Sequence, residues 1–236
     1  MRALFIQHDP GSQPGLVGRA LAERGFELEL LPIGGSIHDA TYHGPFPRAR
    51  EFDLLVPLGA IWSVYDHRAV GTWIQRELDL LREADREAVP VLGICFGGQA
   101  LAAAHGGEVK AADQAEIGFT SVRTEAPQLV PPGPWMQWHH DVFTVPDGGE
   151  ELARNEVGPQ AFRLRRNLGL QFHPEVDADI VASWLEMGGA AAHADLQAAT
   201  GADLDTLLAI AAAERERCER DVATLVDGFL AEVAGV

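Results

Sequence analysis

Cys95 lies where an apolar, strand-like run (VPVLGI, residues 89–94) meets a segment of small residues that favours a helix (FGGQALAAAHGG, residues 96–107). A sharp turn that exposes a nucleophile at such a junction needs small neighbours, because the strand end and the helix start crowd each other. Three glycines meet this need: Gly93, Gly97 and Gly98. The sulfur would also lie at a helix amino terminus, whose N–H groups and dipole favour a thiolate. The pattern predicts a cysteine nucleophile, with a buried structural cysteine as the alternative.

A thiolate nucleophile needs a base and a group that orients the base. The segment QFHPEV (residues 171–176) offers both, because residues two apart in a strand project from the same face. His173 would then carry the proton while the carboxylate of Glu175 holds the imidazole ring. Pro174 biases the histidine toward extended backbone, which suits the end of a strand. Taken alone, the segment also fits an ordinary surface turn.

The segment WHHD (residues 138–141) raises the alternative of a metal site. Adjacent histidines on a strand face opposite ways, and the chain has no H-x-H or H-E-x-x-H spacing, so we expect no metal. His139 and Asp141 share a face and are expected to support the cysteine site as a hydrogen-bonded pair. The other six histidines show no pattern and are expected at the surface or with satisfied partners: His8, His38, His43, His67, His105 and His193.

Strand-like and helix-like segments alternate through the first half of the chain. This alternation predicts an α/β fold whose central sheet is mostly parallel and is flanked by helices on both faces. The expected strands are 3–9, 26–33, 52–59 and 89–95. The expected helices are 14–25, 66–88 and 96–107.

The second half changes character. Short segments separated by turn residues predict an antiparallel meander that returns to the main sheet. These segments are 116–125, 135–146, 151–156, 160–166 and 168–176. From about residue 203 an apolar stripe at helical spacing predicts an amphipathic helix, with Cys218 as a packed apolar residue on that stripe. The helix is expected to pack on its own domain, with a partner protein as the alternative.

The chain of 236 residues has a formal net charge of −17, from 18 lysines and arginines against 35 aspartates and glutamates. An acidic surface repels phosphate backbones and anionic lipids, so we expect neither nucleic acid nor a membrane as partner. No apolar run reaches the roughly 18–20 residues that a spanning helix needs, and the amino-terminal segment favours a strand over a signal peptide. Two cysteines do not make a disulfide framework in a chain this long, so a cytoplasmic location is expected.

Together, the motifs GICFGGQ and QFHPEV resemble those of the class I, triad-type glutamine amidotransferases. The segments EIGF, MQWHHD and SVYD are similar to those of a stand-alone branch related to the glutaminase domain of guanosine monophosphate synthetase. The resemblance covers essentially the whole chain. It implies a flavodoxin-like amidotransferase domain over residues 1–190, followed by a helical extension packed on it over residues 191–236.

The resemblance also implies an activity, namely hydrolysis of the glutamine side-chain amide without a metal or organic cofactor. Cys95 would be the nucleophile, His173 the proton carrier and Glu175 the group that orients it. The oxyanion would bind the backbone N–H groups of Phe96 and of the loop that contains Gly59 and Ala60. Substrate contacts are expected from three further residues: Gln99, His139 and Asp141.

Two segments depart from the family pattern. The oxyanion loop reads Gly59-Ala60-Ile61, where the family usually has Gly-Gly-Pro, and His140 replaces a small residue. No synthetase domain is expected in this chain, so the leading hypothesis is a glutaminase that delivers ammonia to a separate synthetase subunit. One alternative is a free-standing hydrolase of γ-glutamyl amides or peptides. Another is a binding or regulatory module without catalytic activity.

Overall fold

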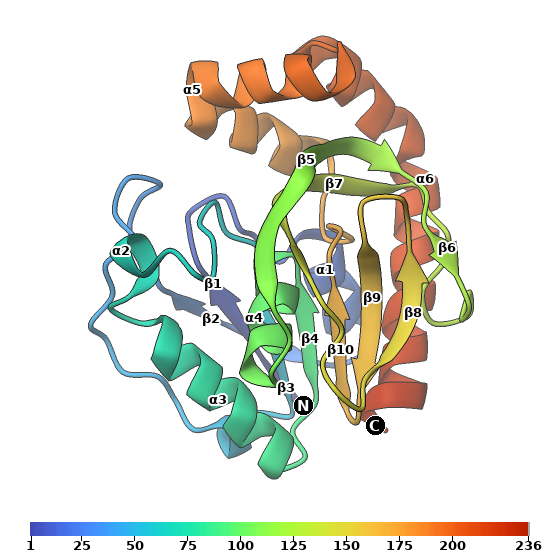
Figure 1. Ribbon diagram of the computed structural model, residues 1–236. Helices are drawn as coiled ribbons and strands as arrows, with labels where there is room; N and C mark the ends of the chain where they lie inside the picture. Colours follow the sequence, from blue (N-terminus) through green and yellow to red (C-terminus); the bar gives the residue numbers. More distant parts are fainter. Residues whose placement is uncertain (236) are drawn as a thin grey trace.

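An eight-stranded sheet organises the computed structural model, which describes residues 1–235 (Figure 1). The strand order is β2-β1-β3-β4-β10-β9-β8-β6. Neighbouring strands from β2 to β10 run parallel, and β9, β8 and β6 continue the sheet in antiparallel fashion. The mostly parallel α/β sheet predicted from the sequence is confirmed. The strands are β1 Arg2–Gln7, β2 Glu27–Pro32, β3 Leu54–Pro57, β4 Val91–Ile94, β6 Arg123–Thr124, β8 Glu150–Arg154, β9 Pro159–Leu164 and β10 Asn167–Leu170.

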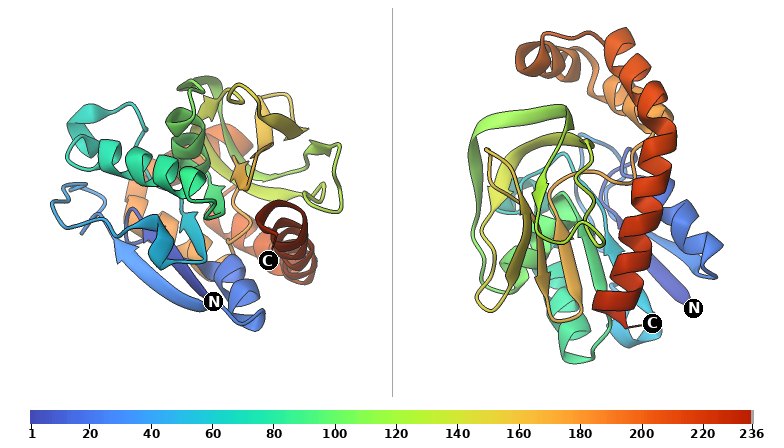
Figure 2. Two further views of the ribbon diagram at one scale, coloured as in Figure 1. Left: turned by 90° about the horizontal axis from the view of Figure 1, so that it is seen from below. Right: turned by 90° about the vertical axis from the view of Figure 1, so that its right-hand side faces the viewer.

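The middle strands of the sheet are covered on both faces. Every residue of β3, β4 and β10 is buried, as expected for continuous apolar sequences such as LLVP and VLGI. Helices α1 (Gly15–Glu23) and α6 (Leu204–Gly228) cover one face, and α3 (Ile74–Arg86) and α4 (Phe96–Ala104) cover the other. Figure 2 shows α6 running along the sheet toward the end at which both chain termini lie.

The single helix expected at residues 66–88 is wrong, because the structure divides it into α2 (His67–Val70) and α3. Asp66 caps α2 by accepting hydrogen bonds from backbone N–H groups. The chain then leaves helical geometry at Trp73, whose φ is −141°. The Trp73 indole is buried and donates a hydrogen bond of 2.7 Å to the carbonyl oxygen of Ala40. Burial of this large side chain therefore decides the break.

The predicted meander is present, but its strands belong to two different sheets. Strands β5 (Val109–Thr120) and β7 (Trp135–Phe143) form a separate antiparallel ribbon, whereas β6, β8 and β9 extend the main sheet. The segment expected as one strand at 116–125 ends at Thr120 and resumes as β6. The ribbon register shifts between Ala111 and Glu116, and such irregularities increase strand twist.

Helix α5 (Ala178–Thr200) lies across one end of the sheet, and α6 leads from there along the sheet (Figure 1). Helix α5 begins within the range expected for the amidotransferase domain, where no helix was predicted, and only its end falls in the helical extension expected from residue 191. It is broken at Gly189, whose φ is 54° and ψ is −141°. The amphipathic helix predicted from about residue 203 is confirmed as α6, and Cys218 is buried in the core that α6 shares with α1. None of the helices described within residues 1–235 combines the length and apolar character needed to cross a membrane.

Candidate active site

Cys95 occupies the turn between β4 and α4 with backbone angles of φ 50° and ψ −107°. A positive φ is uncommon outside glycine and costs on the order of 1–3 kcal/mol. Backbone hydrogen bonds hold the turn, because the Cys95 N–H donates to Leu170 and its carbonyl oxygen accepts from Gln99, both at 2.9 Å. The side chain is almost fully buried and borders a cavity. A strained strand-to-helix turn of this kind can present a nucleophile.

The glycines around Cys95 are required by close packing. A Cβ atom on Gly93 would lie 2.6 Å from the carbonyl oxygen of Gly97, closer than such atoms approach in proteins. A Cβ atom on Gly97 or Gly98 would overlap a backbone carbonyl oxygen of β3 or β10. None of the three has a positive φ, so their role is steric. The crowding expected from the sequence is present at this junction.

His173 and Glu175 meet in a turn beyond β10. The strand ends at Leu170, and the His173 N–H then donates to the carbonyl oxygen of Met136 in β7 at 2.8 Å. His173 Nδ1 lies 2.7 Å from Glu175 Oε1, and the two side chains are 5% and 2% exposed. The sequence argument that placed both residues on one face of a strand is therefore wrong in its local geometry, although the two side chains do pair.

The surroundings of His173 favour its charged form. Burial lowers the pKa of His173, but the Glu175 carboxylate and the Cys95 sulfur together outweigh burial and raise that pKa well above 6.5. The second ring nitrogen, Nε2, is buried and has no partner at normal hydrogen-bond geometry among the described residues. Because Nδ1 is paired with Glu175, Nε2 is the ring nitrogen available to Cys95. An imidazolium in this position stabilises a thiolate.

The loop after β3 passes beside the cysteine. Gly59 and Ala60 line the same cavity as Cys95, and Phe96 is the first residue of α4. A Cβ atom on Gly59 would lie 2.9 Å from His173 Cε1, so close approach requires glycine at this position. Neither Gly59 nor Ala60 is among the described residues with positive φ. Alanine at position 60 therefore takes up the loop conformation without backbone strain.

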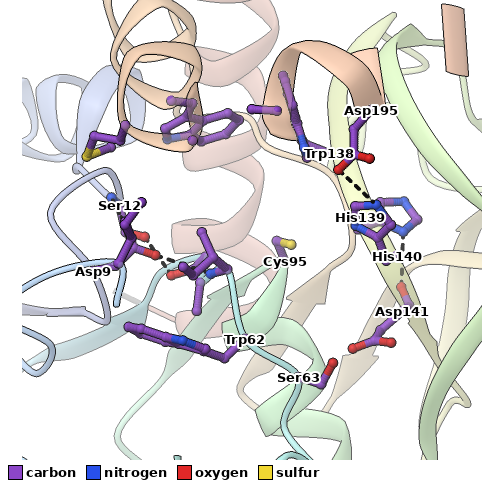
Figure 3. A pocket seen from close by; sticks show the side chains of 18 of the residues that line it. Asp9, Ser12, Trp62, Ser63, Cys95, Trp138, His139, His140, Asp141 and Asp195 are labelled. Atoms are coloured by element: carbon purple, nitrogen blue, oxygen red, sulfur yellow. Dashed lines mark hydrogen bonds and ion pairs between the residues drawn. The ribbon is translucent and has the colours of Figure 1, made fainter. Parts of the chain in front are cut away.

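Gln99, His139 and Asp141 line the cavity, with His139 and Asp141 on one side of Cys95 (Figure 3). Their polar atoms bond largely within the protein. Gln99 Nε2 donates to the carbonyl oxygen of Asp141 at 3.2 Å, and His139 Nδ1 lies 3.0 Å from the same oxygen. The expected His139–Asp141 hydrogen bond thus runs to the backbone of Asp141. Its carboxylate accepts a hydrogen bond of 2.7 Å from the Tyr65 hydroxyl instead, and this bond raises the pKa of Tyr65.

The cavity has a volume of about 420 Å³, and its wall includes three tryptophans. Trp62 and Trp138 lie on opposite sides of Cys95 (Figure 3), and Trp184 of α5 packs edge-on against His173 with ring centroids 4.8 Å apart. The lining described within residues 1–235 contains aspartates and histidines but no lysine or arginine. In the same part of the chain, no group of three or more His, Cys, Asp and Glu side chains is arranged to hold a metal ion.

Three residues around the site were not predicted from the sequence. Trp184 lies on the helix that the sequence analysis did not identify. Glu116 is buried and lies 3.1 Å from His139 Nε2, and its place in the EIGF motif could have indicated it. Gln171, within QFHPEV, places its Nε2 4.0 Å from the Cys95 sulfur.

Comparison with known proteins adds independent findings. The family model described as glutamine amidotransferase class-I matches residues 14–181. The chain is 32% identical over 182 residues to a GMP synthase (glutamine-hydrolyzing) of Francisella tularensis, covering 71% of this chain and 31% of that protein. It is 39% identical over 105 residues to the GMP synthase of Marinobacter nauticus, covering 37% and 20%. The chain thus spans less than a third of the length of these curated relatives.

Two solved structures are similar over nearly the whole chain. A glutamine amidotransferase from Thermotoga maritima superposes with a TM-score of 0.82 at 25% identity, covering 98% of both chains. A glutamine amidotransferase from Methylobacillus flagellatus gives a TM-score of 0.81 at 25% identity, covering 98% of this chain and 95% of the other. The similarity therefore extends through the carboxy-terminal helices.

Proposed function

Because this chain belongs to the class I glutamine amidotransferase family, as its motifs predict, we propose that it hydrolyses the side-chain amide of glutamine and supplies the ammonia to a separate synthetase subunit. One observation carries the proposal. Cys95 at its strained turn borders the same cavity as His173, and Nδ1 of His173 lies 2.7 Å from Glu175. Cys95 is the proposed nucleophile, His173 the proton carrier and Glu175 the residue that orients it.

In the first step, the Cys95 thiolate attacks the side-chain amide carbon and the carbonyl oxygen takes up the negative charge. The N–H of Phe96 and an N–H of the Gly59-Ala60 loop are the proposed donors to this oxyanion. When the tetrahedral intermediate collapses, the carbon–nitrogen bond breaks and His173 Nε2 gives its proton to the leaving nitrogen. The products of this step are ammonia and a γ-glutamyl thioester on Cys95.

In the second step, neutral His173 removes a proton from water, and the oxygen attacks the thioester carbon. The carbon–sulfur bond then breaks, which releases glutamate and restores the thiolate and the imidazolium. The raised pKa of His173 suits this cycle, because the ring is protonated when the leaving nitrogen needs a proton.

The lining of the cavity supports an ammonium group on the substrate. The Asp141 carboxylate is 7% exposed and lies at the wall opposite Ser12 (Figure 3). The described lining has no lysine or arginine but three aspartates: Asp9, Asp141 and Asp195. Its carboxylates therefore outnumber the His173 imidazolium, and the potential in the cavity favours a cation. Asp141 is therefore the proposed partner of the substrate α-ammonium group, while Gln99 and His139 fix the backbone from which Asp141 projects.

The proposed synthetase partner follows from the relatives, which are named as GMP synthases that hydrolyse glutamine. The match covers 31% of that relative, and the proposed role of the matched part is to release ammonia for a synthetase. A cytoplasmic location is also proposed, because Cys95 and Cys218 are both free thiols and the mechanism needs the first of them reduced.

A second candidate is hydrolysis of γ-glutamyl amides that carry a larger amine. The aromatic wall formed by Trp62, Trp138 and Trp184 favours it, because glutamine itself has only a short apolar stem. Release of p-nitroaniline from γ-glutamyl-p-nitroanilide, compared with ammonia release from glutamine, separates the two candidates. A higher kcat/KM for the anilide would make the larger amides the preferred substrates.

The main test is glutamate release from glutamine by the purified chain, with Cys95→Ala and Cys218→Ala as a matched pair of cysteine variants. Cys95→Ala should lose activity by about 10⁴-fold or more, as expected when one member of a catalytic unit is removed, whereas Cys218→Ala should retain it. A glutamine-like electrophile, 6-diazo-5-oxo-L-norleucine, should label wild type and Cys218→Ala but not Cys95→Ala. Failure of the folded wild type to be labelled would instead favour a module without catalytic activity.

A further inference from the structure

Beneath the oxyanion loop lies a buried ion pair that the mechanism above does not use. His8 follows β1, Glu77 lies on α3, and both side chains are fully buried. His8 Nε2 is 3.0 Å from both carboxylate oxygens of Glu77, and His8 Nδ1 is 3.1 Å from the carbonyl oxygen of Gly59. A carbonyl and an ionised carboxylate only accept hydrogen bonds, so both ring nitrogens donate when Glu77 is ionised. The geometry is satisfied by an imidazolium.

We propose that the His8–Glu77 pair is a positioning device that aims the Ala60 N–H at the oxyanion, by holding the carbonyl group of Gly59 on the side away from the cavity. This inference rests on the proposed glutaminase function. The peptide between Gly59 and Ala60 is trans, so its C=O and N–H point in opposite directions. Fixing the carbonyl toward His8 therefore directs the N–H the other way, and Ala60 lines the cavity beside Cys95.

Two further contacts hold the same loop. The Ser12 hydroxyl donates to the carbonyl oxygen of Gly59 at 2.7 Å, so this oxygen accepts from two buried donors. The Asp9 carboxylate accepts from the N–H of Ile61 at 3.2 Å and, through its other oxygen, from the N–H of Ser12 at 3.1 Å. Asp9 and Ser12 lie together on one side of Cys95 (Figure 3). The segment after β1 thus anchors the loop on both sides of Ala60.

His8 also contacts the residue that carries the other proposed donor. Its ring packs against Phe96 with centroids 4.7 Å apart, and it stacks on Trp73 at 5.4 Å. Phe96 carries the proposed N–H donor at the amino terminus of α4, so one buried ring contacts both the oxyanion loop and the residue with the other donor. Burial lowers the pKa of His8, but Glu77, Gly59 and Asp9 outweigh burial and leave that pKa raised. The positioned loop therefore depends on a charge that Glu77 maintains.

The Gly59-Ala60-Ile61 sequence becomes understandable in this arrangement. Ala60 needs no left-handed backbone, and the orientation of its N–H is set by hydrogen bonds to the neighbouring carbonyl rather than by glycine flexibility. A donor whose orientation is fixed before the substrate binds costs no reorganisation during the reaction. The hydrogen bonds to the Gly59 carbonyl group therefore orient the Ala60 N–H before the substrate binds.

The test compares Glu77→Gln and Ser12→Ala with the exposed control His67→Gln, all in the full-length chain. Each test variant should lower kcat for glutamine by about 10-fold to 100-fold, less than the loss seen when an oxyanion donor is removed outright, with KM changed by less than about threefold. Alkylation of Cys95 by iodoacetamide forms no oxyanion, so its rate should stay within about twofold of wild type. The control should match wild type in both assays.

The pH profile adds a readout that a purely structural role would not move. In wild type, kcat should fall as the pH rises through the raised pKa of His8, and in Glu77→Gln this alkaline limb should shift to lower pH. Unchanged kcat and an unchanged alkaline limb in both folded variants would overturn the positioning role. So would an equal loss of turnover and alkylation, which indicates general damage to the site. A wild type without glutamine turnover would overturn the proposed function itself, and this inference with it.

Discussion

Nδ1 of His173 lies 2.7 Å from Oε1 of Glu175, in a place where both side chains are almost fully buried. Burial alone would make the imidazole neutral, yet the carboxylate and the nearby Cys95 sulfur raise the pKa of His173 well above its ordinary range. A protonated ring beside a sulfur can first stabilise the thiolate and then give its proton to the leaving nitrogen. The pair therefore sets the protonation state on which the proposed mechanism depends.

Glu175→Gln should lower the pKa of His173, because the amide keeps the shape of the carboxylate but removes the charge that opposes burial. An NMR titration of the His173 ring, assigned with His173→Gln, measures the shift. We expect kcat for glutamine to fall by about 10²-fold to 10⁴-fold, as when the orienting carboxylate of a comparable triad becomes an amide. A His173 midpoint equal to or above that of wild type would contradict the role given to Glu175.

The same pair should make stability depend on pH in one direction. A raised folded pKa means that the His173 contribution is fully present below the ordinary value of 6.5 and is lost as the pH rises through the raised value. The free energy of unfolding lost in Glu175→Gln should therefore be larger at about pH 6 than at about pH 9, where more of the wild-type ring is neutral. Urea denaturation at the two pH values measures it. A loss of unfolding free energy that is larger at about pH 9 than at about pH 6 would contradict this prediction.

Gly59→Ala should impair catalysis through contact with His173. The added Cβ atom would lie 2.9 Å from His173 Cε1 and 3.9 Å from Cys95 Cβ, so the imidazole or the loop must shift. We expect kcat to fall by about 10-fold or more and the free energy of unfolding to drop by about 1–3 kcal/mol, typical of overpacking. Gly35→Ala is the control, because no atom lies within 4 Å of its Cβ position and its φ is not positive. Equal activity in the two variants would show that the loop accommodates the added methyl group without displacing His173.

The turn at Cys95 could be predicted because its signals are local. The cysteine, the flanking glycines, the apolar strand and the small-residue helix all lie within residues 89–107. The pairing of His173 with Glu175 was also local, although a turn rather than a strand produces it. The assignment of Cys95, His173 and Glu175 to one triad rested on the resemblance of the two motifs to those of the family.

The residues that sequence reasoning missed depend on distant partners. His8 contacts Gly59 and Glu77 across 51 and 69 residues of chain, and nothing near His8 indicates either partner. Helix α5 buries only Ile180, Val181, Leu185 and Leu196 across its length, so its apolar periodicity is weak. The break at Trp73 arises from tertiary burial of one indole, which overrides a continuous helical pattern.

We propose that residues 1–190 form the amidotransferase domain and that residues 191–236 form an extension packed on it. Leu225→Ala tests whether this extension is part of the same folding unit. Leu225 of α6 is fully buried in the core that also contains Leu21 of α1. Its truncation should cost about 2–5 kcal/mol, whereas Ile210→Ala, at a side chain that is 40% exposed, should cost less than about 0.5 kcal/mol. Because α6 shares this core with the sheet, thermal unfolding monitored by circular dichroism and by loss of glutaminase activity should shift together in Leu225→Ala. If the activity transition stays in place while a helical transition moves to lower temperature, the extension unfolds by itself and is not integral to the catalytic core.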